Sequence, residues 1–175
     1  MIIVSDNTAT DMMFERVGGV GAVNQLAQYY GLKNTRATGT ADVWFQALRA
    51  APSAAQFHTE GRTPFGLSSA RDIGRLLEML ERGQAVSRKS SDLMLEMLRG
   101  QVYSSRLPKY VTGFTIPHKT GDFLPYIGND AGILESPGRK VIVSVFTAHH
   151  YGSGAYLEDA IGRVAEQVGN YFAWR

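Results

Sequence analysis

Apolar residues in the first thirty positions recur at the spacing of an α-helix. Two helices are predicted, over residues 8–17 and 20–30, because apolar side chains three or four positions apart share one helix face. Gly18-Gly19 follows the first helix and Gly31 the second, where glycine commonly ends a helix. The side chains expected on the buried faces are Met12, Met13, Val17, Val23, Leu26, Ala27 and Tyr30.

The helical pattern breaks off between residues 34 and 66. This stretch contains glycines and prolines, which interrupt regular elements. A long, partly ordered loop is predicted, with a helical turn at residues 43–49. Loops of this length inside a compact domain are usually functional or disordered.

Two further helices have clear start and end signals. Ser69 and Asp72 resemble a capping box, and Gly83 lies where that helix should end. The next helix should begin near residues 87–91 and end before Gly100. The expected apolar stripes are Ile73, Leu76, Leu77 and Leu80 on the first, and Leu93, Met94, Met97 and Leu98 on the second.

The last third of the chain changes to strand-like patterning. Three strands are predicted, at residues 113–121, 127–134 and 140–147. Turns are expected at Gly128-Asn129-Asp130 and Ser136-Pro137-Gly138, so the strands should form an antiparallel meander. A final helix, residues 154–172, should pack on the sheet. Its predicted apolar face is Leu157, Ile161, Val164, Ala165, Val168 and Phe172.

This order of elements predicts an α+β fold in one domain. The 175 residues are enough to bury a core. We expect a mainly helical region at residues 1–112, followed by the meander and last helix at 113–175.

Composition excludes several function classes. The net charge is only +2 with no basic run, so nucleic acid is not favoured as a partner. The chain has no cysteine, which excludes disulfides and thiolate metal sites, and its four histidines lack metal-ligand spacing. No metal or cofactor is expected. No apolar run reaches membrane-spanning length, and no export signal is recognisable.

Candidate chemistry lies in the first predicted strand, at Lys119-Thr120-Gly121. A cation, a hydroxyl and a residue without a side chain can together hold a carboxylate at a strand edge. Taken alone, the triplet also fits an ordinary surface Lys-Thr at a strand end. Ser5-Asp6-Asn7, at the start of the first predicted helix, favours the site.

With both triplets placed, the chain resembles class A β-lactamases and the related penicillin-recognising serine hydrolases. That family carries a Ser-x-x-Lys box, then Ser-Asp-Asn, then Lys-Thr-Gly. The order, elements and separation of the last two motifs fit, and "VGGVGAVNQLAQYYGLKNTR", "RTPFGLSSARDIGRLLEML" and "HKTGDF" look like successive family segments. The resemblance covers essentially the whole chain. It implies a β-lactamase-like fold, with a helical subdomain beside an antiparallel sheet packed by a C-terminal helix.

The resemblance also implies roles for the matching residues. Ser5 would relay a proton to the leaving nitrogen. Asn7 would hydrogen-bond the substrate's side-chain amide and the catalytic lysine. Lys119 and Thr120 would bind the substrate carboxylate, and Lys119 would also tune the proton relay. The backbone N–H of Asp122 would form half of the oxyanion hole.

Three neighbouring residues complete these expectations. Gly121 would let the substrate approach the strand closely. Asp6 is expected to be structural and to pin its loop. Ser5 has an alternative role as a helix N-cap, which is compatible with proton relay.

The nucleophile box of the family is absent, because no serine in the chain is followed by lysine three residues later. We expect that the chain is the C-terminal part of a longer domain, with the N-terminal part missing and the nucleophile in that part. As given, the chain should then be inactive. A naturally short, non-catalytic carboxylate-binding module is the alternative.

The long loop also lacks the family's Glu-x-x-x-Asn context for deacylation. Asp42 and Glu60 are its only carboxylates, and each is a weak candidate base. Asp122 stands where β-lactamases usually carry a small residue. These departures leave open a penicillin-binding or DD-peptidase type beside a β-lactamase.

The implied substrate is a small molecule, a β-lactam or a peptide-like amide, and the implied location is periplasmic or secreted. Without the family's first strand, residues 141–146 would form an open, apolar sheet edge, and such edges tend to pair with another chain. Self-association through this edge is therefore a further hypothesis.

Overall fold

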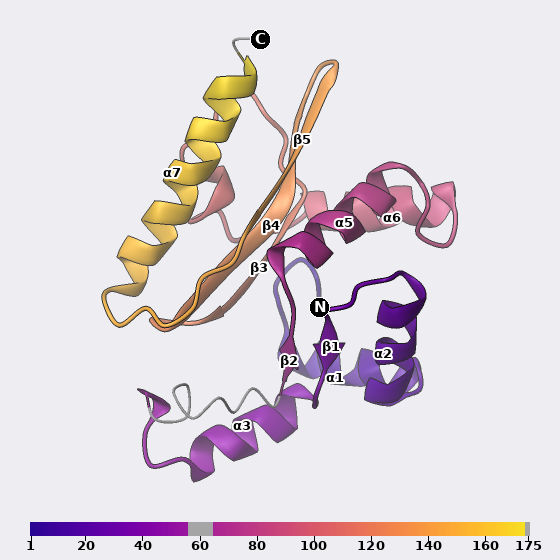
Figure 1. The fold of residues 1–175 in the computed structure, drawn as a ribbon, viewed down its shortest axis with the longest axis vertical. Helices are drawn as coiled ribbons and strands as arrows, with labels where there is room; N and C mark the ends of the chain where they lie inside the picture. The colour runs from indigo at the N-terminus through magenta and orange to yellow at the C-terminus, as the bar shows by residue number, and fades with distance from the viewer. Residues whose placement is uncertain (56–64, 174–175) are drawn as a thin grey trace. The chain divides into compact units, whose positions relative to one another are not determined.

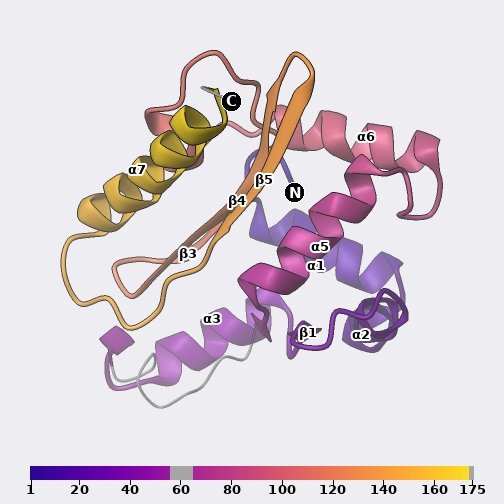
Figure 2. The ribbon, with the colours of Figure 1, turned by 45° about the horizontal axis from the view of Figure 1, so that its top comes forward.

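The computed structural model describes residues 1–55 and 65–173. The chain divides into two compact units. The first contains Met1 and residues 5–72, and the second contains residues 2–4 and the chain from Ile73 onward. The second unit holds the larger sheet and the long C-terminal helix, as the ribbons in Figures 1 and 2 show.

In the first unit, α1 (Asn7–Arg16) begins after Asp6. The Asp6 carboxylate accepts a hydrogen bond of 2.6 Å from a backbone N–H of the first turn, which makes it the N-cap. The predicted buried face of this helix is wrong. No residue of α1 is buried, and Met12, Met13 and Val17 are exposed, so helical spacing alone did not identify a core-facing side.

The glycine boundaries of α2 (Gly19–Tyr29) are confirmed. Gly18 before the helix and Gly31 after it have φ angles of 96° and 68°. Residues with a side chain rarely adopt these values, so glycine is needed at both ends. Ala27 is the buried residue of α2, whereas Leu26 is exposed, contrary to prediction.

The predicted turn at residues 43–49 is a full helix, α3 (Ala41–Ala50). Its start is capped twice. The Thr40 hydroxyl accepts from a first-turn N–H, and the Asp11 carboxylate accepts from two further N–H groups at 2.7 and 2.9 Å. Asp11 lies on another helix, which is why local sequence did not reveal this cap. The same stretch of chain also contains an antiparallel pair of short strands, β1 (Arg36–Ala37) and β2 (Gly66–Leu67).

α5 (Ala70–Glu81) begins with half of the predicted capping box. The Asp72 N–H donates to the Ser69 hydroxyl at 3.2 Å. The Asp72 carboxylate instead accepts from the Asn34 N–H at 2.7 Å and the Thr35 hydroxyl at 3.0 Å. Burial raises the pKa of Asp72, but these hydrogen bonds together lower it by more. The net result is a pKa below the usual value of an aspartate. Asp72 therefore ties the loop after α2 to the start of α5.

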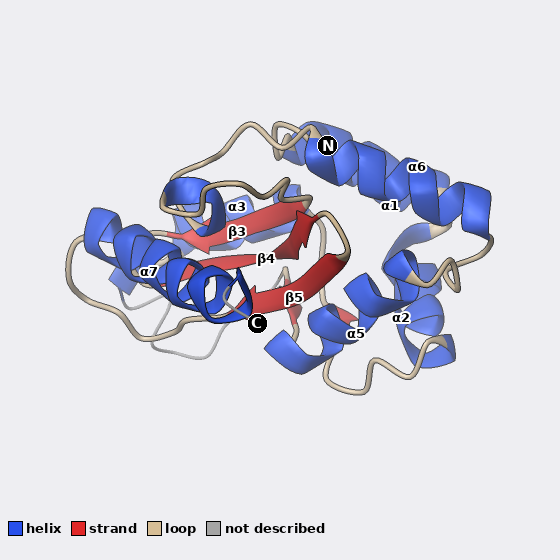
Figure 3. Ribbon diagram, turned by 90° about the horizontal axis from the view of Figure 1, so that it is seen from above, coloured by secondary structure: helices blue, strands red, loops and turns tan. Residues whose placement is uncertain are grey.

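The predicted antiparallel meander is confirmed in the second unit (Figure 3). Its strands, in spatial order, are β3 (His118–Phe123), β4 (Ile127–Ser136) and β5 (Arg139–Val145). The turn expected at residues 128–130 is wrong, because these residues lie within β4. The chain reverses instead just before β4, where the Tyr126 N–H donates to the Phe123 carbonyl at 2.9 Å.

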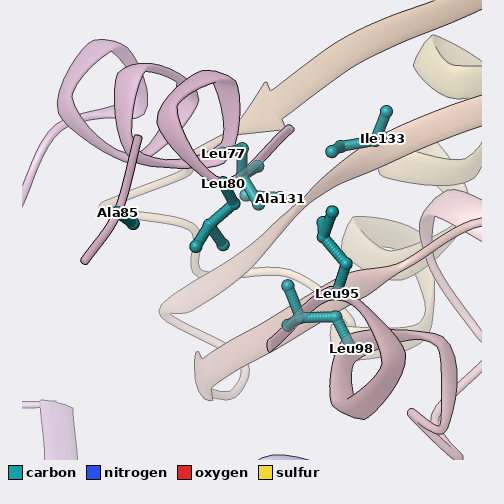
Figure 4. Close-up of a cluster of buried hydrophobic side chains, with 7 residues drawn as sticks. All are labelled: Leu77, Leu80, Ala85, Leu95, Leu98, Ala131 and Ile133. Atoms are coloured by element: carbon teal, nitrogen blue, oxygen red, sulfur yellow. The ribbon is translucent and has the colours of Figure 1, made fainter. Parts of the chain in front are cut away.

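Both faces of this sheet are covered. α5 and α6 (Arg88–Arg99) pack on one face, and η1 (Leu107–Lys109) and α7 (Gly154–Ala173) pack on the other. Because neighbouring residues of a strand point to opposite faces, β4 contributes to both cores. The first core, drawn in Figure 4, comprises Leu77, Leu80, Ala85, Leu95, Leu98, Ala131 and Ile133. The second comprises Leu107, Leu134, Val143, Ile161 and Ala165.

The apolar stripes of two helices differ from prediction. On α6 the predicted Leu98 is confirmed in the core and Met94 packs against it, but Leu95 is buried there too, whereas Leu93 and Met97 are exposed. On α7 the outer members Val164 and Phe172 are exposed as well. Only one side of each helix packs on the sheet, and this side is narrower than the set of apolar residues along the helix. The remaining apolar residues are therefore exposed. None of the described helices is both long and apolar enough to cross a membrane.

Candidate active site

The predicted carboxylate site lies on β3, which within the described chain pairs on one side only, with β4. The N–H of Ile133 donates to the carbonyl of Pro117 at 3.0 Å. In an antiparallel ladder, hydrogen-bonded pairs recur at every second residue. With the observed register, the backbone groups of Lys119 face β4, while those of Thr120 and Asp122 face the outer edge.

The Lys119 ammonium lies at this outer edge. Its Nζ donates to the Thr120 carbonyl at 2.6 Å. Burial lowers the pKa of Lys119, the nearby carboxylates Asp122 and Asp130 raise it, and the Arg106 guanidinium lowers it further. The net result is a pKa below the usual lysine value, because the ammonium is partly desolvated. A partly desolvated cation at a strand edge is placed to bind an anion.

Thr120 and Gly121 occupy different positions around the same edge. Thr120 pairs with Asp130 in the register and shares its face of the sheet, whereas Lys119 shares the face of Ala131. A carboxylate could therefore reach both side chains only from the edge of the strand. A Cβ placed on Gly121 would meet no atom within 4 Å, so the space beside this residue is open.

Behind the edge, Asp122 is paired with a buried arginine that sequence analysis missed. The Arg106 side chain is 3% exposed, and its guanidinium lies 2.7 Å from the Asp122 carboxylate and 3.2 Å from that of Glu158 on α7. It also donates to the Asn129 carbonyl at 2.9 Å. A single arginine in a loop gives no local signal of burial, so only tertiary structure identifies it.

A second buried polar group supports the start of β3. The Asp130 side chain is fully buried, and its carboxylate lies 3.0 Å from His118 Nδ1. The same carboxylate accepts a hydrogen bond of 3.1 Å from the Leu107 N–H. This arrangement fixes the residue directly before Lys119 and joins β3 to η1 through β4. Sequence patterns did not assign a role to His118 or Asp130, because the two residues lie twelve positions apart on different strands.

Ser5-Asp6-Asn7 belongs to the first unit. The N-cap role considered for Ser5 is wrong, since the Asp6 carboxylate caps α1, which is a structural role for Asp6. Ser5 has a φ of 53°, an uncommon backbone conformation for serine that is enriched at functional sites. Asn7 is the first residue of the helix. Because the two triplets lie in different units, their facing one another stays a prediction.

Neither candidate deacylating base, Asp42 or Glu60, gains support from the described contacts. Asp42 lies exposed in the first turn of α3, where its carboxylate accepts from Gln46 Nε2 at 2.7 Å. Glu60 lies outside the described residues. Among the residues that the structure describes, no group of three His, Cys, Asp or Glu is arranged to hold a metal ion.

Comparison with known proteins decides the family. A family model described as "Beta-lactamase enzyme family" matches residues 1–172. The chain belongs to this family. The beta-lactamase family chain is 28% identical over 171 residues to the extended-spectrum beta-lactamase PER-1 of Pseudomonas aeruginosa, covering 93% of the chain and 51% of that protein. It therefore spans about half the length of the curated relatives it matches.

Solved structures also share the fold of this chain. PBP-A is 29% identical, with a TM-score of 0.81 over 100% of this chain and 59% of that one. A PBP-A mutant described as an acyl-enzyme complex with penicillin G gives the same identity and TM-score over 100% of this chain and 60% of that one. The predicted resemblance and the α+β, β-lactamase-like fold are confirmed.

Proposed function

We propose that the chain is part of a serine β-lactamase-like hydrolase that acts on β-lactams or peptide-like amides through an acyl-enzyme. The observation that carries this proposal is the outer edge of β3. There the Lys119 ammonium lies 2.6 Å from the Thr120 carbonyl, and the register directs the Asp122 N–H to the same edge. A cation beside a backbone donor suits a substrate with a carboxylate close to its reacting carbonyl.

In the complete reaction, a serine hydroxyl adds to the amide carbonyl and forms an ester as the carbon–nitrogen bond breaks. Ser5 passes a proton to the departing nitrogen, and Asn7 orients the substrate's side-chain amide. Lys119 and Thr120 hold the carboxylate, while the Asp122 N–H stabilises the oxyanion. Water then hydrolyses the ester. The nucleophile would come from a Ser-x-x-Lys box that this sequence does not contain.

Benzylpenicillin binding to the 175-residue chain tests this proposal. Intact-mass measurement should show no covalent adduct, whereas amide NMR signals of Lys119, Thr120 and Asp122 should shift on titration. The methyl ester of benzylpenicillin is the matched control, because it lacks the carboxylate, and it should leave these signals in place. A covalent adduct would show that the nucleophile assignment is wrong, and unmoved β3 signals would remove the site.

A penicillin-binding or DD-peptidase type is the second candidate function. The similarity to PBP-A and the carboxylate at Asp122 favour it. In a longer protein containing the nucleophile, a persistent acyl-enzyme would support this type, and rapid turnover would support a β-lactamase and a part in antibiotic resistance. For a non-catalytic carboxylate-binding module, the coding sequence upstream of Met1 is decisive, since an in-frame Ser-x-x-Lys there argues against it.

Two further properties belong to this proposal. We place the parent protein in the periplasm or outside the cell, as is typical of its family. We also propose self-association through residues 141–146 of the chain. Within the described residues, β5 pairs with β4 alone, which leaves its second edge available.

A further inference from the structure

The position of Asp122 conflicts with a site that binds anions. It follows Gly121 on the edge strand, and its side chain is 45% exposed. An uncompensated carboxylate here would repel a substrate carboxylate held by Lys119, because charges of like sign repel at short range, and it would thereby weaken substrate binding. The structure contains a specific answer to this conflict.

Arg106 compensates the charge of Asp122 from behind the strand. Its guanidinium lies 2.7 Å from Asp122 Oδ2, and its Nη1 donates to the carbonyls of Asn129 at 2.9 Å and Gly121 at 3.4 Å. One buried side chain thus contacts the end of β3 and the adjacent part of β4. Contacts to two carbonyls and a carboxylate fix its planar guanidinium in a single orientation.

Glu158 and Ser105 hold the arginine on the α7 side. Glu158 Oε1 lies 3.2 Å from the guanidinium and accepts from the Ser105 hydroxyl at 2.8 Å. By strand alternation, Asp122 also projects to this face, whereas Lys119 projects to the opposite one. The negative charges therefore gather behind the sheet, away from the edge where Lys119 lies.

We propose that Arg106 is a positioning residue of the carboxylate site. It holds the Asp122 side chain on the α7 side and offsets part of its charge, while the Asp122 N–H stays directed to the outer edge of β3. This inference rests on the proposed function, because it deepens the carboxylate site at β3.

Charge compensation between two variants tests the proposal in the full 175-residue chain. Arg106→Gln should weaken benzylpenicillin binding about tenfold, or roughly 1.4 kcal/mol, because Asp122 is left uncompensated. Adding Asp122→Asn should restore binding to within about twofold. Arg163→Gln is the matched control, since Arg163 pairs with Asp159 and Glu166 on the outer side of α7, and it should leave binding unchanged.

The titration of Lys119 gives a readout that needs no ligand. Asp122 and Asp130 raise the pKa of Lys119, whereas burial and Arg106 lower it. Asp122→Asn should therefore lower the pKa of Lys119, and Arg106→Gln should raise it, as followed by NMR of the lysine ε-CH₂ group. Asp122→Asn alone keeps the test valid if Arg106→Gln does not fold. It should lower the pKa of Lys119, because the Asp122 carboxylate raises that pKa.

The outcomes separate this inference from the proposed function. If the unsubstituted chain does not bind benzylpenicillin at β3, the proposed function fails. If it binds but Asp122→Asn does not rescue Arg106→Gln, Arg106 is only structural and the inference is overturned. A loss of binding in Asp122→Asn alone would also overturn it, because the carboxylate would then contribute directly to binding.

Discussion

At the scale of single residues, Lys119 carries a structural cost that is consistent with its proposed binding role. Burial lowers the pKa of its ammonium, which means that the folded protein holds the charged form less favourably than water does. The carbonyl of Thr120, 2.6 Å away, and the nearby carboxylates offset part of this cost. A charged group that is partly desolvated gains more interaction energy from a bound anion than a fully hydrated one does. This property suits a cation that binds a ligand better than one that is only structural.

Lys119→Met should stabilise the fold at pH 7, by about 1 kcal/mol, because it removes a charge that the fold holds unfavourably. Below the lowered pKa both states are protonated and the cost is fully present. As the pH rises from the folded pKa towards about 10.4, the unfolded value, the native lysine loses its proton first, so stability rises and the gain from methionine disappears.

Urea unfolding at pH 7 and pH 10 measures this effect, with Lys89→Met on exposed α6 surface as the control. A destabilised Lys119→Met protein at pH 7 would contradict it, and would mean that the ion contacts outweigh burial.

At the scale of elements, the second unit is held by a sheet with helices on both faces. α5 and α6 bury leucines against β4, and α7 buries Leu157, Ile161 and Ala165 on the other side. The polar groups at the site are supported by the same layers, since Arg106 joins β3, β4 and α7. The geometry of the β3 edge therefore depends on the packing of α7, although this helix supplies no proposed catalytic group.

Two leucines on α6 separate core packing from surface helix formation. Leu95→Ala should reduce the free energy of unfolding by roughly 2–4 kcal/mol, because Leu95 is 2% exposed in the first core. Leu93→Ala, at a 52% exposed position of the same helix, should change it by less than about 0.5 kcal/mol. Chemical denaturation of both variants provides the comparison, and equal losses would show that the face of α6 is assigned wrongly.

At the scale of the molecule, apolar burial is uneven between the two units. Both core clusters belong to the second unit. Among the described residues of the first unit, the buried apolar side chains are Ala27, Leu32 and Ala41, while Met12, Met13 and Val43 are exposed. Since hydrophobic stabilisation follows buried apolar area, most of it is located in the unit that carries the Lys119 site. The organisation into one functional domain stays a prediction.

Self-association through β5 is expected to depend on concentration. Light scattering should show masses above 19.2 kDa as the protein is concentrated, and amide hydrogen exchange at the free edge of β5 should slow in parallel, because added strand pairing protects backbone N–H groups. A single-chain mass at every concentration, with fast exchange at that edge, would exclude the interface.

The sequence by itself determined the family, the α+β class and the order of the main elements. These follow from local information: the two triplets, the glycines that end helices, and the change from helical to alternating periodicity. It also located the Lys119 strand, although not its first residue. Prediction failed where one local pattern is compatible with more than one structure. Gly128-Asn129-Asp130 lies in a strand rather than in the predicted turn, and Leu93 and Met97 of α6 are exposed rather than buried in the core.

Tertiary structure decided what lies behind the site. Arg106, Glu158, His118 and Asp130 come from separate elements, and none carries a local signal of burial or pairing. Asp11 and Asp72 likewise find their partners about thirty or more residues away. The physical reason is that the energy of a buried charge or cap depends on which groups folding brings beside it, and a sequence pattern records spacing along the chain rather than that neighbourhood.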